Sequence, residues 1–88
     1  MSEQIVKELR LLKTIASMDR PTIHDLVRET GTPKTTVTRH LKDLRDIFKL
    51  DIRFVKYSPN ESDDRNSGYY VIQDWGVIDQ HEFMLRFY

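Results

Sequence analysis

The sequence predicts an α+β fold with a three-helix core, a two-stranded β-hairpin and a C-terminal helix. Apolar residues recur every three or four positions up to residue 48, which is the period of an amphipathic helix. From residue 50 they alternate with polar residues, which is the period of a half-buried strand. A chain of 88 residues has the size of one small domain, so a single domain over 1–88 is expected.

The first helix is expected to begin after Ser2 and to end near Met18. Ser2 suits the N-cap, because a serine hydroxyl can accept a hydrogen bond from a free N–H of the first turn. Pro21 follows shortly after Met18, and proline cannot continue a helix. Four apolar residues at helical spacing are expected on the inward side, with Val6 and Ile15 beside them: Ile5, Leu9, Leu12 and Ala16.

The next two helices are expected to meet through a tight glycine turn. Thr22 and Asp25 have the spacing of a capping box, so a short second helix begins there, with Ile23, Leu26 and Val27 turned inward. Gly31 suits the left-handed conformation that ends a helix. Thr32 is expected to cap the third helix, and Pro33 suits its first position, where no N–H donor is needed.

The third helix is expected over 33–48, with two unlike sides. Its inward side carries Val37, Leu41, Leu44 and Phe48. At the helical period of about 100° per residue, Arg39 lies roughly opposite Val37. Basic and hydroxyl side chains share the outward side with Arg39: Lys34, Thr35, Thr36, Thr38 and Lys42.

A hairpin and a last helix complete the expected fold. Leu50, Ile52 and Phe54 are expected on the inner side of the first strand, and a polar loop separates it from a second strand over 68–73. Trp75 is expected to pack against the core or a helix. Asp79 and Glu82 then have capping-box spacing at the start of a helix over 79–88.

This order resembles the winged helix-turn-helix superfamily, and in particular its small DeoR-like transcriptional regulators. The stretch from Pro33 to Leu44 is similar to their recognition helix, and the stretch from Gly68 to Ile72 is similar to the strand that follows their wing. The resemblance implies one winged helix-turn-helix domain over 1–88, with the helix-turn-helix at about 22–48, the wing hairpin at about 50–73 and a C-terminal helix at about 79–88. It also implies sequence-specific binding of double-stranded DNA and transcription regulation, with 33–48 in the major groove.

The outward side of the third helix carries the expected DNA contacts. Arginine bound to guanine is the commonest specific contact in the major groove, and threonine can meet base edges or thymine methyl groups. We therefore expect Thr35 and Arg39 at bases. Lys34, Thr36, Thr38 and Lys42 are expected to be shared between bases and phosphates. The alternative for this side is an ordinary solvated surface. Thr22 is expected either to bind a phosphate or only to cap its helix.

The formal net charge of zero conceals two oppositely charged regions. Residues 34–56 carry seven basic and three acidic side chains, a local charge of +4, whereas residues 57–88 carry −4. The expected wing is acidic, and Arg65 is its one candidate for a phosphate contact. Arg53 and Lys56 on the flanking strand are either further candidates or ordinary solvated side chains. The alternative is a winged-helix protein–protein interaction module that uses the acidic wing against a basic partner.

The remaining features concern assembly and the classes of function to exclude. Phe83, Met84, Phe87 and Tyr88 are expected either to form a homodimer interface or to cover the first helix of the same chain. The histidines have no metal-like spacing and no nucleophilic set or phosphate loop is present, so no metal, cofactor or enzyme activity is expected. No apolar run approaches the ~20 residues of a membrane helix and no signal peptide is recognised, so a cytoplasmic protein is expected.

Overall fold

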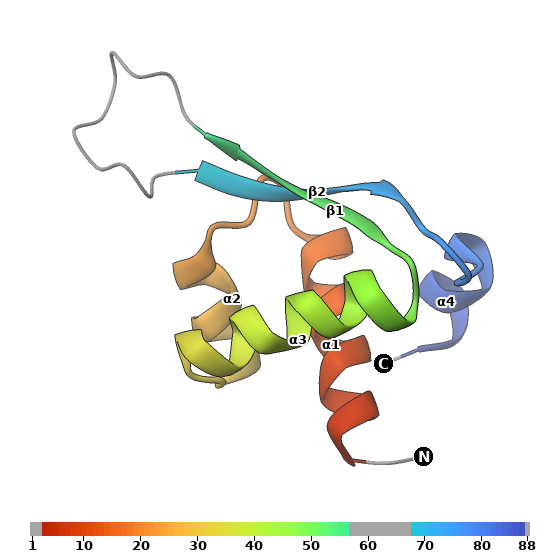
Figure 1. Cartoon of the computed structure of the whole chain (residues 1–88), viewed down its shortest axis with the longest axis horizontal. Coiled ribbons are helices and arrows are strands. Elements are labelled where there is room, and N and C mark those ends of the chain that lie inside the picture. The colour runs from red at the N-terminus through yellow and green to blue at the C-terminus, as the bar shows by residue number, and fades with distance from the viewer. Residues whose placement is uncertain (1–2, 57–67, 88) are drawn as a thin grey trace.

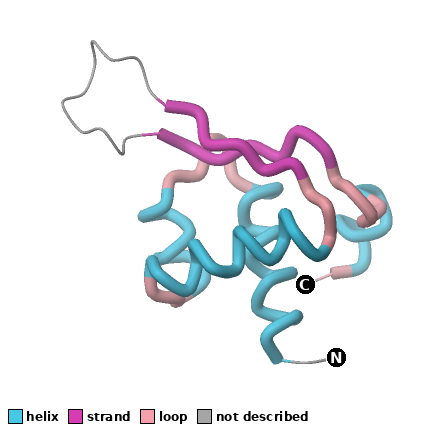
Figure 2. The backbone as a smooth tube through the Cα atoms, in the orientation of Figure 1, coloured by secondary structure: helices cyan, strands magenta, loops and turns pink. Residues whose placement is uncertain are grey.

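The computed structural model describes residues 3–56 and 68–87. Their elements are α1 (Glu3–Ser17), α2 (Ile23–Thr30), α3 (Lys34–Ile47), β1 (Asp51–Lys56), β2 (Gly68–Asp74) and α4 (Gln80–Arg86). The first three helices gather below the strand pair, and α4 lies beyond the end of β2 (Figure 1). Figure 2 shows the same separation of helices from strands along the backbone. The predicted α+β class is confirmed.

The hydrophobic core lies between the first three helices and the start of β1. Its side chains are leucine, isoleucine and valine, and each such side chain contributes about 1.5–3 kcal/mol when fully buried. The buried apolar residues are Leu11, Leu12, Ile15, Ile23, Leu26, Val37, Leu41, Leu44, Leu50 and Ile52. Phe48 and Trp75 are partly buried and pack against this cluster, as predicted.

The inward side of α1 differs from the predicted one. Leu12 is buried, but Ile5 is 36% exposed, and the other buried residues of α1 are Glu8, Leu11 and Ile15. The first turns of α1 extend past α2 and α3 (Figure 1). The buried side has the same helical spacing as the predicted one, at positions 8, 11, 12 and 15. It was not recognised from the sequence because its first residue, Glu8, is charged. The predicted cap Ser2 lies outside the described residues.

The two strands pair antiparallel, with Ile52 opposite Ile72 and an irregularity between Asp51 and Ile52. Ile52 is buried, but Phe54 is 37% exposed, so the prediction that Phe54 points into the core was wrong. Only the start of β1 reaches the core. The Phe54 ring lies instead against the Tyr70 ring on β2, with their centroids 5.2 Å apart.

The second strand also connects to the segment between α1 and α2. The Tyr70 N–H donates to the Pro21 carbonyl oxygen at 2.9 Å. After β2, the Asp79 carboxylate accepts from the Glu82 N–H at 3.0 Å and so caps α4. The helix ends at Arg86 rather than at residue 88, because Phe87 leaves the helical conformation. No helix in the described part of the chain has the length and apolar composition to span a membrane.

Candidate nucleic-acid interface

Residues 31–33 turn the chain between α2 and α3. Gly31 has φ 64° and ψ 26°, the left-handed conformation predicted for it. The prediction that Thr32 caps α3 was wrong: Pro33 occupies the N-cap, and the Thr32 hydroxyl donates back to the Thr30 carbonyl oxygen at 3.3 Å. Thr32 lies one residue too early for a cap, and proline has no hydroxyl. The first turn of α3 therefore has no side-chain cap.

The N-terminus of α2 is fixed by the predicted capping box. The Thr22 hydroxyl accepts from the Asp25 N–H at 3.2 Å, and the Thr22 N–H donates to the Asp25 carboxylate at 2.9 Å. Arg28 also pairs with Asp25 at 2.7 Å. The bonds from the Thr22 backbone and from Arg28 lower the pKa of Asp25. Thr22 is therefore a helix cap, and its phosphate contact stays a prediction.

The two sides of α3 are separated as predicted. Val37, Leu41 and Leu44 are buried against the core. Of the proposed DNA-binding residues, Thr36 is half-buried, and the others on α3 are exposed: Lys34, Thr35, Thr38, Arg39 and Lys42. The helix thus presents a cationic and hydroxyl-bearing surface, which we call the outward side.

The cations of the outward side are not neutralised within the described chain. Among residues 3–56 and 68–87, no ion pair involves Lys34, Arg39 or Lys42. The Thr38 hydroxyl donates to the Lys34 carbonyl oxygen at 3.0 Å, so its lone pairs remain for an incoming donor. Unpaired cations at the surface attract anions without first breaking an ion pair.

A groove of about 240 Å³ lies where the start of α3 faces the strand pair. Lys34 and Thr38 line it on the α3 side, and Phe54 and Tyr70 line it from the strands. Ile23 at the start of α2 completes the lining. The groove places the outward side of α3 next to the strand pair.

The predicted wing contacts divide into three cases. The Arg53 guanidinium pairs with Asp51 at 3.0 Å, and this partner raises the pKa of Arg53. Lys56, at the end of β1, is exposed. Arg65 lies outside the described residues. Arg53 is therefore already paired, and Lys56 is the cation of β1 without an ion pair in the described part of the chain.

Sequence reasoning missed two buried polar residues, one on α1 and one on α3. Glu8 of α1 is 1% exposed and His40 of α3 is 3% exposed. Burial, followed by the interaction with Asp43, raises the pKa of Glu8 to about 7. Burial, with Arg39 nearby, lowers the pKa of His40. The signal for Glu8 was present in the sequence, because it shares helical spacing with Leu11, Leu12 and Ile15.

The proposed dimer residues of α4 lie partly against their own chain. The Phe83 ring packs on Trp75 at 5.8 Å and stacks on Phe87 at 5.0 Å. The Lys13 ammonium of α1 donates to the Met84 carbonyl oxygen at 2.7 Å. Tyr88 lies outside the described residues. Leu85, which the sequence reasoning did not single out, is 63% exposed.

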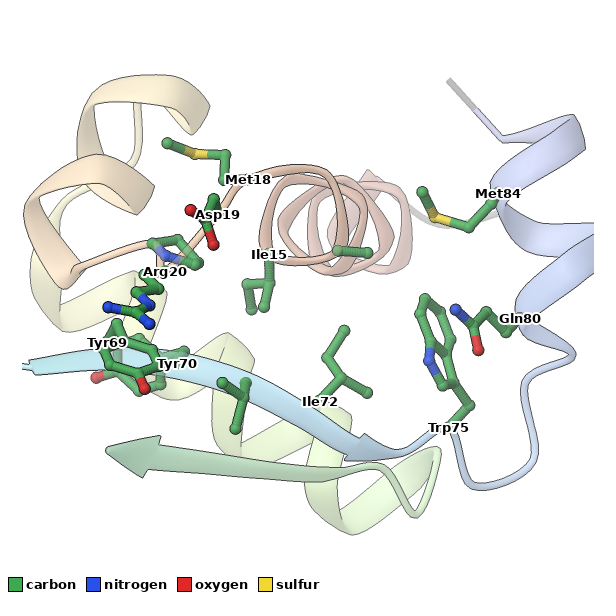
Figure 3. A pocket seen from close by; sticks show the side chains of 13 residues that line it. Ile15, Met18, Asp19, Arg20, Tyr69, Tyr70, Ile72, Trp75, Gln80 and Met84 are labelled. Atoms are coloured by element: carbon green, nitrogen blue, oxygen red, sulfur yellow. The ribbon is translucent and has the colours of Figure 1, made fainter. Parts of the chain in front are cut away.

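A pocket of about 420 Å³ lies between α1, β2 and α4 (Figure 3). Ile15, Ile72, Trp75 and Met84 line its apolar part, and Gln80 stands beside Trp75. Arg20 lies at the other end, with its guanidinium 5.5 Å from the centre of the Tyr69 ring. Within the described residues, no group of three or more histidine, aspartate or glutamate side chains is placed to hold a metal ion.

Comparison with known proteins identifies the family. A family model described as "Winged helix-turn helix" matches residues 1–86. A crystal structure of a DUF2131 family protein from Shewanella amazonensis superposes with a TM-score of 0.67 at 30% sequence identity, covering 92% of this chain and 76% of that one. No curated protein matches the chain. With its helix pair, glycine turn and strand pair, the chain belongs to the winged helix-turn-helix family.

Proposed function

We propose that the protein is a sequence-specific DNA-binding transcriptional regulator whose α3 enters the major groove of double-stranded DNA. The observation that carries this proposal is the separation of α3 into a buried apolar side and an outward side whose cations form no ion pair within residues 3–56 and 68–87. The major groove is about 12 Å wide and admits one helix. Membership of the winged helix-turn-helix family supports the same role.

The residues of the outward side have distinct proposed roles. Arg39 and Thr35 contact base edges, because an arginine fork fits guanine and a threonine is short enough for close approach. Lys34, Thr36, Thr38 and Lys42 contact phosphates and neighbouring bases and so set the position of the helix. Thr22 and Arg65 are proposed phosphate contacts. The proposed role is binding, with no cofactor and no catalysis.

We further propose that the protein acts as a homodimer on a short palindrome, in the manner of the DeoR-like regulators that it resembles. One domain with few unpaired cations neutralises few phosphates, and each phosphate contributes only about −0.9 to the slope of log affinity against log salt. Two copies would double that contribution. The exposed Leu85 of α4 supports a dimer surface at the C-terminal helix, together with Phe83, Met84, Phe87 and Tyr88.

The experiment is a titration of random-sequence duplex at low and high salt, followed by in-vitro selection of the preferred site. The Arg39→Ala variant should bind the selected site roughly ten- to a hundredfold more weakly, because a bidentate arginine–base contact contributes about 1–3 kcal/mol. Arg10→Ala is the matched control, since Arg10 is an exposed arginine on α1 and is not among the proposed DNA-binding or dimer residues.

Two results would contradict the proposal. If the wild type shows no salt-sensitive binding, the protein–protein interaction module with the acidic wing becomes the better description. If Arg39→Ala binds the selected site as tightly as the wild type, α3 is not the reading element. Light scattering of the free and DNA-bound protein tests the dimer, and a monomer on a site without symmetry would refute it.

A further inference from the structure

A buried carboxyl group lies where α1 packs under α3. The Glu8 side chain is 1% exposed, and its Oε2 atom has no hydrogen-bond partner among the described residues. Its carboxyl group interacts with that of Asp43 on α3. Two carboxyl groups can hydrogen-bond only when one of them carries a proton. The Glu8 and Asp43 carboxyl groups can therefore share one proton where α1 packs on α3.

The charged groups around Glu8 come from the two helices. On α1, the Gln4 amide donates to the Asp43 carboxylate at 3.2 Å, and Lys7 acts on the neighbouring His40. On α3, Arg39 stabilises the ionised form of Glu8, and Asp43 destabilises it. Within the described chain, no charged group of α2 or β2 is among those that act on Glu8. Arg39 and Asp43 lie one turn apart on α3, so their side chains are neighbours on the helix surface. Arg39 is therefore the cation that responds to the charge of Glu8.

The charge of Glu8 changes within the physiological range. Its pKa is raised to about 7, first by burial and then by Asp43. Burial lowers the pKa of His40, which favours its neutral form. Above pH 7, the buried Glu8 carries a negative charge. Opposite charges attract strongly in such a partly desolvated place, and Arg39 has no ion pair of its own among the described residues.

We propose that Glu8 is a positioning residue that controls Arg39 through a proton. With the proton present, Glu8 bonds to Asp43, and Arg39 is free to reach DNA. Without the proton, the carboxylate pair attracts Arg39 toward α1 and competes with DNA for its guanidinium. DNA binding is thereby coupled to proton uptake. This inference rests on the proposed function, because it requires Arg39 to contact DNA.

The first test uses the protein without DNA. In an NMR titration, the Glu8 carboxyl carbon should report ionisation near pH 7, against 4.5 for an ordinary glutamate. Because the folded pKa is raised, the contribution of Glu8 to stability is complete below pH 4.5 and is lost as the pH rises to about 7. Glu8→Gln mimics the protonated carboxyl, so its melting temperature should exceed that of the wild type at pH 8 and match it at pH 4. An ordinary Glu8 titration overturns the inference.

The second test measures affinity for a selected duplex, or for random-sequence duplex, at pH 6 and pH 8 with constant salt. Linkage to one proton of pKa about 7 weakens wild-type binding by up to about tenfold between these values. The Glu8→Gln variant should bind the duplex with the same affinity at pH 6 and at pH 8. Glu29→Gln is the matched control, because it removes an exposed acid from α2 and should keep the wild-type pH dependence.

Each outcome separates the inference from the proposed function. If the wild type and Glu8→Gln weaken in parallel, or if wild-type binding does not change with pH, the inference fails and the proposed function stands. If neither protein shows salt-sensitive binding at either pH, both fail. Should Glu8→Gln not fold, Asp43→Asn takes its place. An asparagine amide can donate to an ionised Glu8, so binding by Asp43→Asn should also be flat from pH 6 to pH 8.

Discussion

The turn between α2 and α3 and the turn between β2 and α4 both contain glycine in the left-handed conformation, with φ 64° at Gly31 and 59° at Gly76. Their surroundings differ. A Cβ atom added to Gly31 would meet nothing within 4 Å. A Cβ atom added to Gly76 would overlap the backbone carbonyl groups of Phe48 and Lys49. Glycine is thus needed at position 31 only for the left-handed backbone conformation. At position 76 it is needed for that conformation and also because another part of the backbone lies too close for a side chain.

That close approach joins the C-terminal segment to the end of α3. The Val77 N–H donates to the carbonyl oxygen of Phe48, the C-cap of α3, at 3.0 Å. Lys49, next to it, has φ 61°, which is unusual for a residue with a side chain. The helix-turn-helix turn is therefore set locally, while the backbone path after α3 depends on residues almost thirty positions later.

The largest expected effect is that of Gly76→Ala. The new methyl group meets backbone atoms that cannot move as a flexible side chain would, and the left-handed conformation adds strain. We expect the free energy of unfolding to fall by about 3 kcal/mol or more, measured by urea denaturation. A loss below about 1 kcal/mol would show that the end of α3 and the β2–α4 turn separate easily.

Gly31→Ala should have a smaller effect, about 1 kcal/mol. Only the left-handed conformation opposes the methyl group there, because the space around Gly31 is open. Gly31→Asn should recover much of this loss, since asparagine tolerates the conformation better. Thermal denaturation of both variants is the measurement. An effect of Gly31→Ala as large as that of Gly76→Ala would remove the distinction between the two turns.

The smallest expected effect concerns a side chain that holds the second turn. The Asp74 carboxylate accepts from the Gly76 N–H at 2.7 Å at an exposed site. Asp74→Ala should lower the free energy of unfolding by about 0.5 kcal/mol, the low end for one hydrogen bond. Asp74→Asn keeps an acceptor and should stay near the wild type. A loss above about 2 kcal/mol for Asp74→Ala would show that this bond, rather than packing, holds the turn.

The sequence predicted those features that depend on neighbours within one turn. Thr22 with Asp25, the left-handed Gly31 and the buried line of Val37, Leu41 and Leu44 all follow from short spacing rules. The outward side of α3 followed from the same helical period. The DNA contacts of that side stay predictions.

The features that the sequence did not predict depend on contacts between distant segments. Glu8 shares the helical spacing of Leu11, Leu12 and Ile15, but that spacing alone does not predict a buried carboxyl group, because burying a charge is costly. The inward side of α1 was predicted wrongly because two sets of positions have the same helical spacing. The predicted set was 5, 9, 12 and 16, and the buried set is 8, 11, 12 and 15. The close packing at Gly76 joins the turn after β2 to the end of α3. These two segments lie far apart in the sequence, so no short spacing pattern predicts their contact. Long-range packing decided each of these cases.

The chain has a single tryptophan, and its position gives the protein an internal optical probe. Trp75 is half-buried, follows β2 directly and packs on Phe83 of α4. Its fluorescence therefore arises from one place, the junction between the strand pair and the C-terminal helix. A shift of the emission to longer wavelength that precedes the loss of helical circular dichroism would mean that α4 detaches before the three-helix core unfolds.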